Sequence, residues 1–137
     1  MKPSQLIVFK YQDEHVATLE DGLYVLKSSL NDQAKVAKLA RFLKASKEGW
    51  DYAAKHQAEA VKILLAADTA GVLTKQHQTR MVSEVVKLIG SSPWGYLQTD
   101  DYDRTVNELL STKSTPVIAT KPDGAYTHAV WDKAFKN

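Results

Sequence analysis

Hydrophobic and polar positions follow two different patterns along this chain. A nearly continuous apolar run, Leu6–Tyr11, combines aliphatic, β-branched and aromatic residues and is bounded by polar residues on both sides, which is typical of a β-strand. A second run, Leu23–Leu26, follows Gly22, whose permissive backbone suits a sharp turn. This run predicts another short strand, although the leucine and lysine around it also suit a helix. The chain is therefore expected to begin with one or two short strands.

Beyond Asn31 the apolar positions recur every three or four residues, which indicates an amphipathic helix. Asn31 or Asp32 is a suitable N-cap, because its side-chain oxygen can accept a hydrogen bond from an unpaired first-turn N–H. The pattern pauses near His56 and Gln57 and resumes at Ala58, so it predicts one long helix with a break or two helices in series. The apolar stripe of this region comprises Val36, Leu39, Ala40, Phe42, Leu43, Trp50, Ala54, Val61, Leu64 and Leu65.

Three further helices are predicted in the second half of the chain. Thr74 suits an N-cap for the first of them, and Gly90 is expected to end it. The next helix opens at Thr99 with acidic residues in its first turn, where negative charge meets the positive end of the helix dipole. The last helix follows a turn at residues 122–124 and carries the apolar residues Tyr126, Val130, Trp131, Ala134 and Phe135.

Composition places the chain among ordinary folded proteins, with 44% apolar and 25% charged residues. The formal net charge of +2 is too small to indicate a nucleic-acid or membrane-surface partner. No cysteine is present, which excludes disulfide scaffolds and thiolate metal sites. The N-terminal apolar run is too short for a signal peptide or a membrane span. The chain as written is therefore expected to be cytoplasmic and not inserted in a membrane. The sequence alone does not fix its compartment.

These patterns predict a single domain over residues 1–137, with a strand-rich segment at residues 5–27 and a helical region at residues 31–137. The expected fold class is an α/β fragment that is predominantly α-helical, with about five helices and one or two short N-terminal strands.

Several stretches follow one another in a recognisable order along nearly the whole chain: Glu20–Leu26, Leu39–Ser46 with Gly49 and Trp50, Ala58–Val61, Gly95–Leu97, Tyr102–Val106 and Gly124–Thr127. Together they resemble the C-terminal half of a family of solute-binding proteins. That family comprises the components of ABC importers for nitrate, sulfonates, taurine and thiamine-pyrimidine precursors, and it includes related fungal pyrimidine synthases.

The resemblance implies a partial lobe of the type II periplasmic-binding-protein fold, in which a ligand lies in the cleft between two lobes. It also implies that the segment matching Asp21–Leu26 crosses the hinge, and that the solute is a small pyrimidine-like or sulfonate-like molecule. The first half of the family's chain has no counterpart here, so the expected function is that of a small-solute-binding module or of a truncated remnant of one. The active-site motif of the synthases belongs to the absent half, and no enzymatic activity is expected.

Three residues near the expected hinge are candidates for contact with such a solute. Glu20 and Asp21 lie beside Gly22, and two carboxylates next to a turn suit the amine of a small cationic or heterocyclic ligand. Asp21 also suits an ordinary turn hydrogen bond with its own backbone. Tyr24 suits stacking on a planar ligand, or a place in the core or at its rim.

The sequence indicates no metal site, cofactor or catalytic residue. The four histidines, His15, His56, His77 and His128, do not have metal-ligand spacing, and no paired nucleophile and base is recognised. A basic row on the first helix is more typical of a solvated helix face than of a phosphate-binding surface, so no nucleic-acid partner is expected. The row comprises Lys35, Lys38, Arg41, Lys44 and Lys47.

The broad apolar stripes of the helices would cover a sheet in the resembling family, and this chain lacks most of that sheet. Burying one large apolar side chain is worth about 1.5 to 3 kcal/mol, so leaving several exposed is costly. We therefore expect the helices to pack on one another, on the short strands or on a second copy, with a homodimer preferred. The alternative function is a stand-alone helical protein-interaction module that uses its exposed apolar helix faces.

Overall fold

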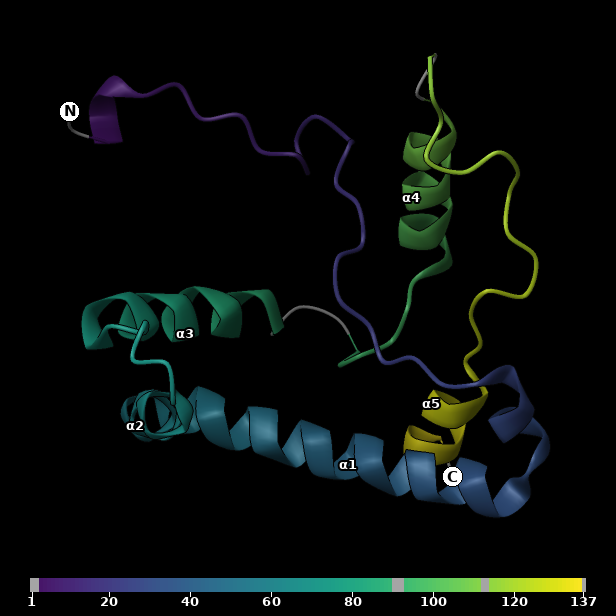
Figure 1. Ribbon diagram of the computed structural model, residues 1–137, viewed down its shortest axis with the longest axis horizontal. Helices are drawn as coiled ribbons and strands as arrows, with labels where there is room; N and C mark the ends of the chain where they lie inside the picture. The colour runs from purple at the N-terminus through teal and green to yellow at the C-terminus, as the bar shows by residue number, and fades with distance from the viewer. Residues whose placement is uncertain (1–2, 90–92, 112–113, 137) are drawn as a thin grey trace. The chain divides into compact units, whose positions relative to one another are not determined.

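The computed structural model describes residues 3–89, 93–111 and 114–136, and its chain divides into two compact units (Figure 1). The first unit combines residues 1–25 with 97–127, and the second combines residues 26–96 with 128–137. The described residues contain five α-helices, which confirms a predominantly α-helical chain. The assignment of the whole chain to one domain stays a prediction.

The second unit is built on the long helix α1 (Gln33–Lys55), which follows the short 3-10 helix η2 (Lys27–Asn31). Helix α5 (Ala129–Phe135) packs across the N-terminal half of α1 (Figure 1). The buried residues at this end are small: Val36 and Ala40 of α1, and Ala134 of α5. Beyond the other end of α1, helices α2 (Gln57–Ala67) and α3 (Lys75–Ile89) pack against each other.

Side-chain caps set the N-termini of two helices in the second unit. The carboxylate of Asp32 accepts hydrogen bonds from the backbone amides of Ala34 at 2.9 Å and Lys35 at 3.2 Å. The hydroxyl of Thr74 accepts one from the amide of His77 at 3.3 Å. Both predicted N-caps are therefore confirmed, and they satisfy amide groups that lack a partner within the first helical turn.

The predicted break in the long helical region is confirmed at His56, which lies between α1 and α2. Tyr52 spans this break. Its ring stacks on His56 with the centroids 4.3 Å apart, and its hydroxyl donates a hydrogen bond to the carboxylate of Glu59 at 2.7 Å. That hydrogen bond stabilises the neutral phenol and raises the pKa of Tyr52 above its usual value.

The first unit is organised around α4 (Thr99–Ser111). Arg104 of this helix donates a hydrogen bond from Nε to the backbone carbonyl of Ala17 at 2.7 Å. The hydroxyl of Thr105 accepts one from the backbone amide of Leu19 at 2.9 Å. An extended part of the N-terminal segment is thereby tied to α4.

The segment that follows α4 also returns to this helix. Lys121 pairs with Asp103 at 2.8 Å, and the ring of Tyr126 packs on that of Tyr102 with the centroids 4.5 Å apart. Val106, which is 3% exposed, lies on the same side of α4 as Tyr102. Contacts from both flanking segments thus converge on one helix.

Neither unit encloses a large apolar core. The buried apolar side chains of the described residues are Val36, Ala40, Val61, Val106 and Ala134, none larger than valine. The chain exposes 11104 Å² of surface, whereas two separate compact bodies of these sizes would expose about 8,600 Å² together. The structure therefore exposes roughly 2,500 Å² more than compact folding predicts.

The prediction of N-terminal strands is wrong. Neither Leu6–Tyr11 nor Leu23–Leu26 forms a strand, and the described residues contain none elsewhere. A strand requires a neighbouring strand for its backbone hydrogen bonds, and the described part of the chain supplies no such neighbour. The β-branched and aromatic residues show a tendency to form strands, but such a segment becomes a strand only when it is paired.

The last helix is shorter than the apolar pattern predicts, because α5 begins at Ala129 and Tyr126 precedes it. The ring of Tyr126 packs instead on Tyr102 of α4, within the first unit. The predicted helix stop at Gly90 lies outside the described residues.

Replacing Tyr102 with phenylalanine is expected to leave the free energy of unfolding unchanged or to raise it by up to about 1 kcal/mol. The hydroxyl of Tyr102 is buried and has no hydrogen-bond partner within the described residues, so its removal relieves a desolvation penalty. Urea unfolding of the purified chain measures the change. Tyr126→Phe is the matched control, because its hydroxyl lies 3.3 Å from Thr99 Oγ1. A larger loss of stability in Tyr102→Phe than in Tyr126→Phe would contradict the expectation.

Candidate functional site

The three residues predicted to contact a solute lie in the extended segment that precedes η2. Glu20 and Asp21 are exposed, and neither side chain makes a hydrogen bond or ion pair within the described residues. Tyr24 is 86% exposed, and its hydroxyl lies close to Gly22, 3.4 Å from where a Cβ would stand. The structure places these residues near one another on an open segment, and their role as ligand contacts stays a prediction.

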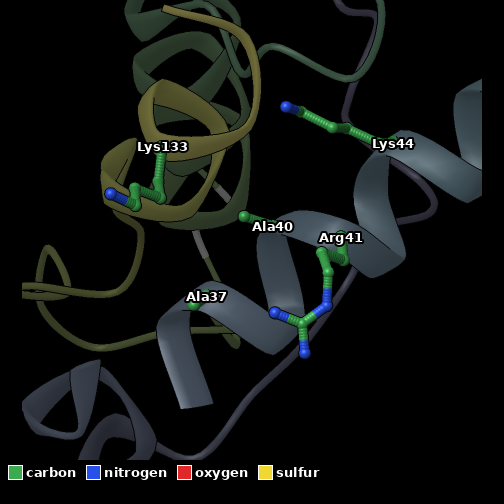
Figure 2. Close-up of a pocket in the computed structure, with 5 residues that line it drawn as sticks. All are labelled: Ala37, Ala40, Arg41, Lys44 and Lys133. Atoms are coloured by element: carbon green, nitrogen blue, oxygen red, sulfur yellow. The ribbon is translucent and has the colours of Figure 1, made fainter. Parts of the chain in front are cut away.

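A hollow lies between α1 and α5, within the second unit. Its volume is about 210 Å³, and it is lined by Ala37, Ala40, Arg41 and Lys44 from α1 and by Lys133 from α5. The α1 residues share one side of the helix because they are three or four positions apart. Figure 2 shows the short alanine side chains between the three cations, which extend in different directions. The hollow is therefore bordered by positive charge, and no carboxylate lines it.

Only part of the predicted basic row contributes to this hollow. Lys35 lies 4.0 Å from Asp32, and Lys47 pairs with Asp51 at 2.6 Å. The remaining members, Lys38, Arg41 and Lys44, have no ion pair within the described residues. Lys133 belongs to α5 and could not be assigned to this site from the sequence, because only the packing of α5 on α1 brings it there.

An aromatic cluster holds α5 against the turn at residues 93–96. The ring of Trp131 contacts Tyr96 and Phe135 with centroid distances of 4.8 and 5.2 Å, and its Nε1 donates a hydrogen bond to the carbonyl of Trp94 at 2.8 Å. Tyr96 also stacks on His128 at 4.2 Å, with Oη 3.3 Å from Nδ1. These rings contact one another, so the cluster fixes α5 in place rather than offering a slot for a ligand.

The turn before this cluster depends on a glycine. Gly95 has a φ of +65°, in the left-handed region that side chains disfavour, and the amide of Tyr96 donates to the carbonyl of Pro93 at 3.0 Å. This turn directs both Trp94 and Tyr96 toward α5, which explains why the loop carries two aromatic residues.

Lys136 borders the aromatic cluster at the end of α5. Its ammonium lies 2.9 Å from a carboxylate oxygen of Asp132 and 5.9 Å from the centre of the Trp131 ring. The hydrogen bond to Asp132 stabilises the charged ammonium and raises the pKa of Lys136 above its usual value.

The N-terminal apolar segment, defined as Leu6–Tyr11, is the longest exposed and mainly apolar run among the described residues. The exposed fractions are 54% for Leu6, 84% for Ile7, 71% for Val8, 73% for Phe9 and 70% for Tyr11. The predicted helical stripe is covered unevenly, because Trp131 and Phe135 pack in the aromatic cluster while Phe42 and Trp50 are 56% and 43% exposed. Exposed apolar runs of this size are typical of interaction surfaces.

The described residues hold neither a cluster of metal-binding side chains nor a helix that could span a membrane. No group of three or more His, Cys, Asp or Glu residues is placed to hold a metal ion among them. In that part of the chain, no helix combines the length and the apolar character needed to cross a membrane.

The chain matches no known family model, no curated protein and no solved structure. The resemblance to solute-binding proteins therefore stays a hypothesis from the sequence.

Asp132→Asn is expected to lower the pKa of Lys136 toward the usual value of a lysine, because it removes the charge that stabilises the ammonium. The pKa is raised in the folded state, so the Asp132 contact favours folding below the ordinary lysine pKa, and its effect disappears as the pH rises through the raised value. NMR titration of the lysine side-chain resonances measures the change. Lys133→Gln is the control, since Lys133 is not a partner of Asp132, and an equal change in both variants would contradict the assignment.

Proposed function

We propose that this chain is a protein-interaction module that completes the cover of its apolar surfaces against another polypeptide. The observation that carries the proposal is the N-terminal apolar segment, which presents five exposed large apolar side chains in a run of six residues. The buried side chains of the described residues are no larger than valine, and none of these five side chains is covered within the chain.

The amount of exposed surface agrees with this function. The excess over two compact bodies is roughly 2,500 Å², and obligate interfaces bury about 2,000 to 5,000 Å² in total. About half of that total lies on each partner, so an association at the upper end of this range would cover the excess of one chain.

A polypeptide suits the N-terminal apolar segment better than a lipid surface does. The backbone amides and carbonyls of residues 6–9 make no hydrogen bond within the described residues. Hydrocarbon offers no partner for such groups, and each unsatisfied one costs several kcal/mol there. Another polypeptide can cover the side chains and satisfy the backbone at the same time.

The test measures the mass at which the chain migrates in an extract of the cells that produce it. Size-exclusion chromatography with native mass spectrometry is expected to find the chain in a stable complex heavier than the 15.3 kDa of one copy. The complex should persist in high salt, because the proposed contact is mainly apolar and salt does not weaken apolar contacts. A chain that migrates alone at its own mass would overturn the proposal.

Binding of a small solute is the second candidate, and the hollow between α1 and α5 is the observation that favours it. Arg41, Lys44 and Lys133 border a space suited to a small anion, with no carboxylate to repel it. The sulfonates implied by the family resemblance carry such a charge. The predicted contacts Glu20, Asp21 and Tyr24 suit the amine or ring of a pyrimidine instead, and they lie in the other unit.

Methanesulfonate is expected to raise the thermal unfolding midpoint of the chain in a saturable way, because a ligand that binds only the folded state stabilises it with the logarithm of its concentration. Arg41→Gln should remove most of the shift. Arg80→Gln, an exposed arginine on α3, is the matched control and should retain it. An equal shift with sodium chloride at the same ionic strength, or an undiminished shift in Arg41→Gln, would count against a solute site.

A further inference from the structure

We propose that the N-terminal apolar segment forms an antiparallel β-pair with the same segment of a second copy, about a two-fold axis beside Val8. The inference rests on the interaction function proposed above and names its partner. The residues best suited to a strand are Leu6–Tyr11, and no strand lies beside them within the described residues.

The segment is delimited by turns on both sides. The 3-10 helix η1 (Pro3–Gln5) precedes it. After it, the amides of residues 13–16 donate to the carbonyls of residues 10–12 at 3.0 to 3.2 Å, and His15 adopts a φ of 58°. The backbone between these turns is free for pairing, because residues 6–9 make no hydrogen bond within the described chain.

The segment is also tethered to a folded element. Ala17 and Leu19, which follow the second turn, are hydrogen-bonded to Arg104 and Thr105 of α4. Arg104 is itself held by Asp101 at 2.7 Å. Two copies joined through the segment would therefore be joined through short, anchored connections rather than through long free tails.

The side-chain pattern indicates a strand that is covered on both faces. Alternate residues of a strand point to opposite faces, which places Leu6 and Val8 on one face and Ile7 and Phe9 on the other. An edge strand with one solvated face would alternate apolar with polar residues, whereas a continuous apolar run is typical of a strand buried on both sides. The other exposed apolar side chains, among them Phe42, Ile63 and Leu88, can supply that cover in a dimer.

Symmetry and charge favour antiparallel pairing of identical segments. A two-fold axis normal to the ribbon and beside Val8 places Val8 opposite its symmetry mate, and it places Ile7 opposite Phe9 of the second copy, a favourable β-branched and aromatic pair. Lys10 then lies opposite an apolar residue. Parallel pairing in register would instead place Lys10 opposite Lys10, which is destabilising.

Light scattering coupled to size exclusion tests the oligomer with the purified full-length chain. The expected mass is twice the 15.3 kDa of one chain. Val8→Asp places two carboxylates opposite each other at the axis, and it should raise the dimer dissociation constant about tenfold or more. Leu23→Asp is the matched control: Leu23 is 62% exposed, compared with 71% for Val8, and lies outside the segment, so this variant should remain dimeric. Circular dichroism checks that both variants retain their helices.

Cysteine cross-linking tests the register, with no background because the chain contains no cysteine. Val8→Cys is expected to form a disulfide between copies, since residues directly opposite in an antiparallel pair have Cα atoms about 4.5 to 5.5 Å apart. Ile7→Cys and Phe9→Cys should each cross-link poorly alone and efficiently when mixed. Efficient cross-linking of Ile7→Cys and of Phe9→Cys with themselves would indicate parallel pairing and would overturn the proposal.

The remaining outcomes separate this inference from the proposed function. A purified monomer that is nevertheless found in a complex in cell extract would overturn the homodimer and leave the interaction module standing. A chain that is monomeric in both settings would overturn both. Equal loss of the dimer in Val8→Asp and Leu23→Asp would show that the copies associate through non-specific apolar contacts. That result would also overturn the strand pair.

Discussion

The shortage of buried apolar surface constrains everything else in this structure. The buried apolar residues of the described chain are valines and alanines, while larger aliphatic and aromatic residues are half-buried or exposed. A small domain buries only a limited share of its surface. Without large buried residues, the net free energy of unfolding is therefore small. The protein therefore depends on local devices within each unit and on whatever covers its exposed residues.

The local devices are specific and differ between the units. In the second unit, the Asp32 side chain caps α1, and the aromatic cluster around Trp131 holds α5 against the turn at residues 93–96. In the first unit, α4 binds extended chain on both sides through Arg104, Thr105 and Asp103. Polar contacts of this kind position segments accurately, but they contribute less to stability than a large apolar core does. They present the N-terminal apolar segment without burying it.

The candidate functions of this chain depend on its surfaces. The hollow between α1 and α5 is lined by two alanines and three basic residues. Basic residues spaced along α1 were visible in the sequence, but their grouping with Lys133 was not. Glu20, Asp21 and Tyr24 were chosen for their place beside an expected hinge. That hinge depended on a strand at residues 23–26, and the strand is absent.

The amino-acid sequence by itself determined the helices, the N-caps at Asp32 and Thr74, and the break at His56. These features depend on side chains a few residues apart, and such interactions are encoded locally. Only the tertiary structure decided that Leu6–Tyr11 has no neighbouring strand among the described residues, that Tyr126 packs on Tyr102, and that Lys133 joins the basic residues of α1. Strand pairing and inter-helix contacts join residues distant in the chain, so a local pattern can show a tendency but cannot supply the partner.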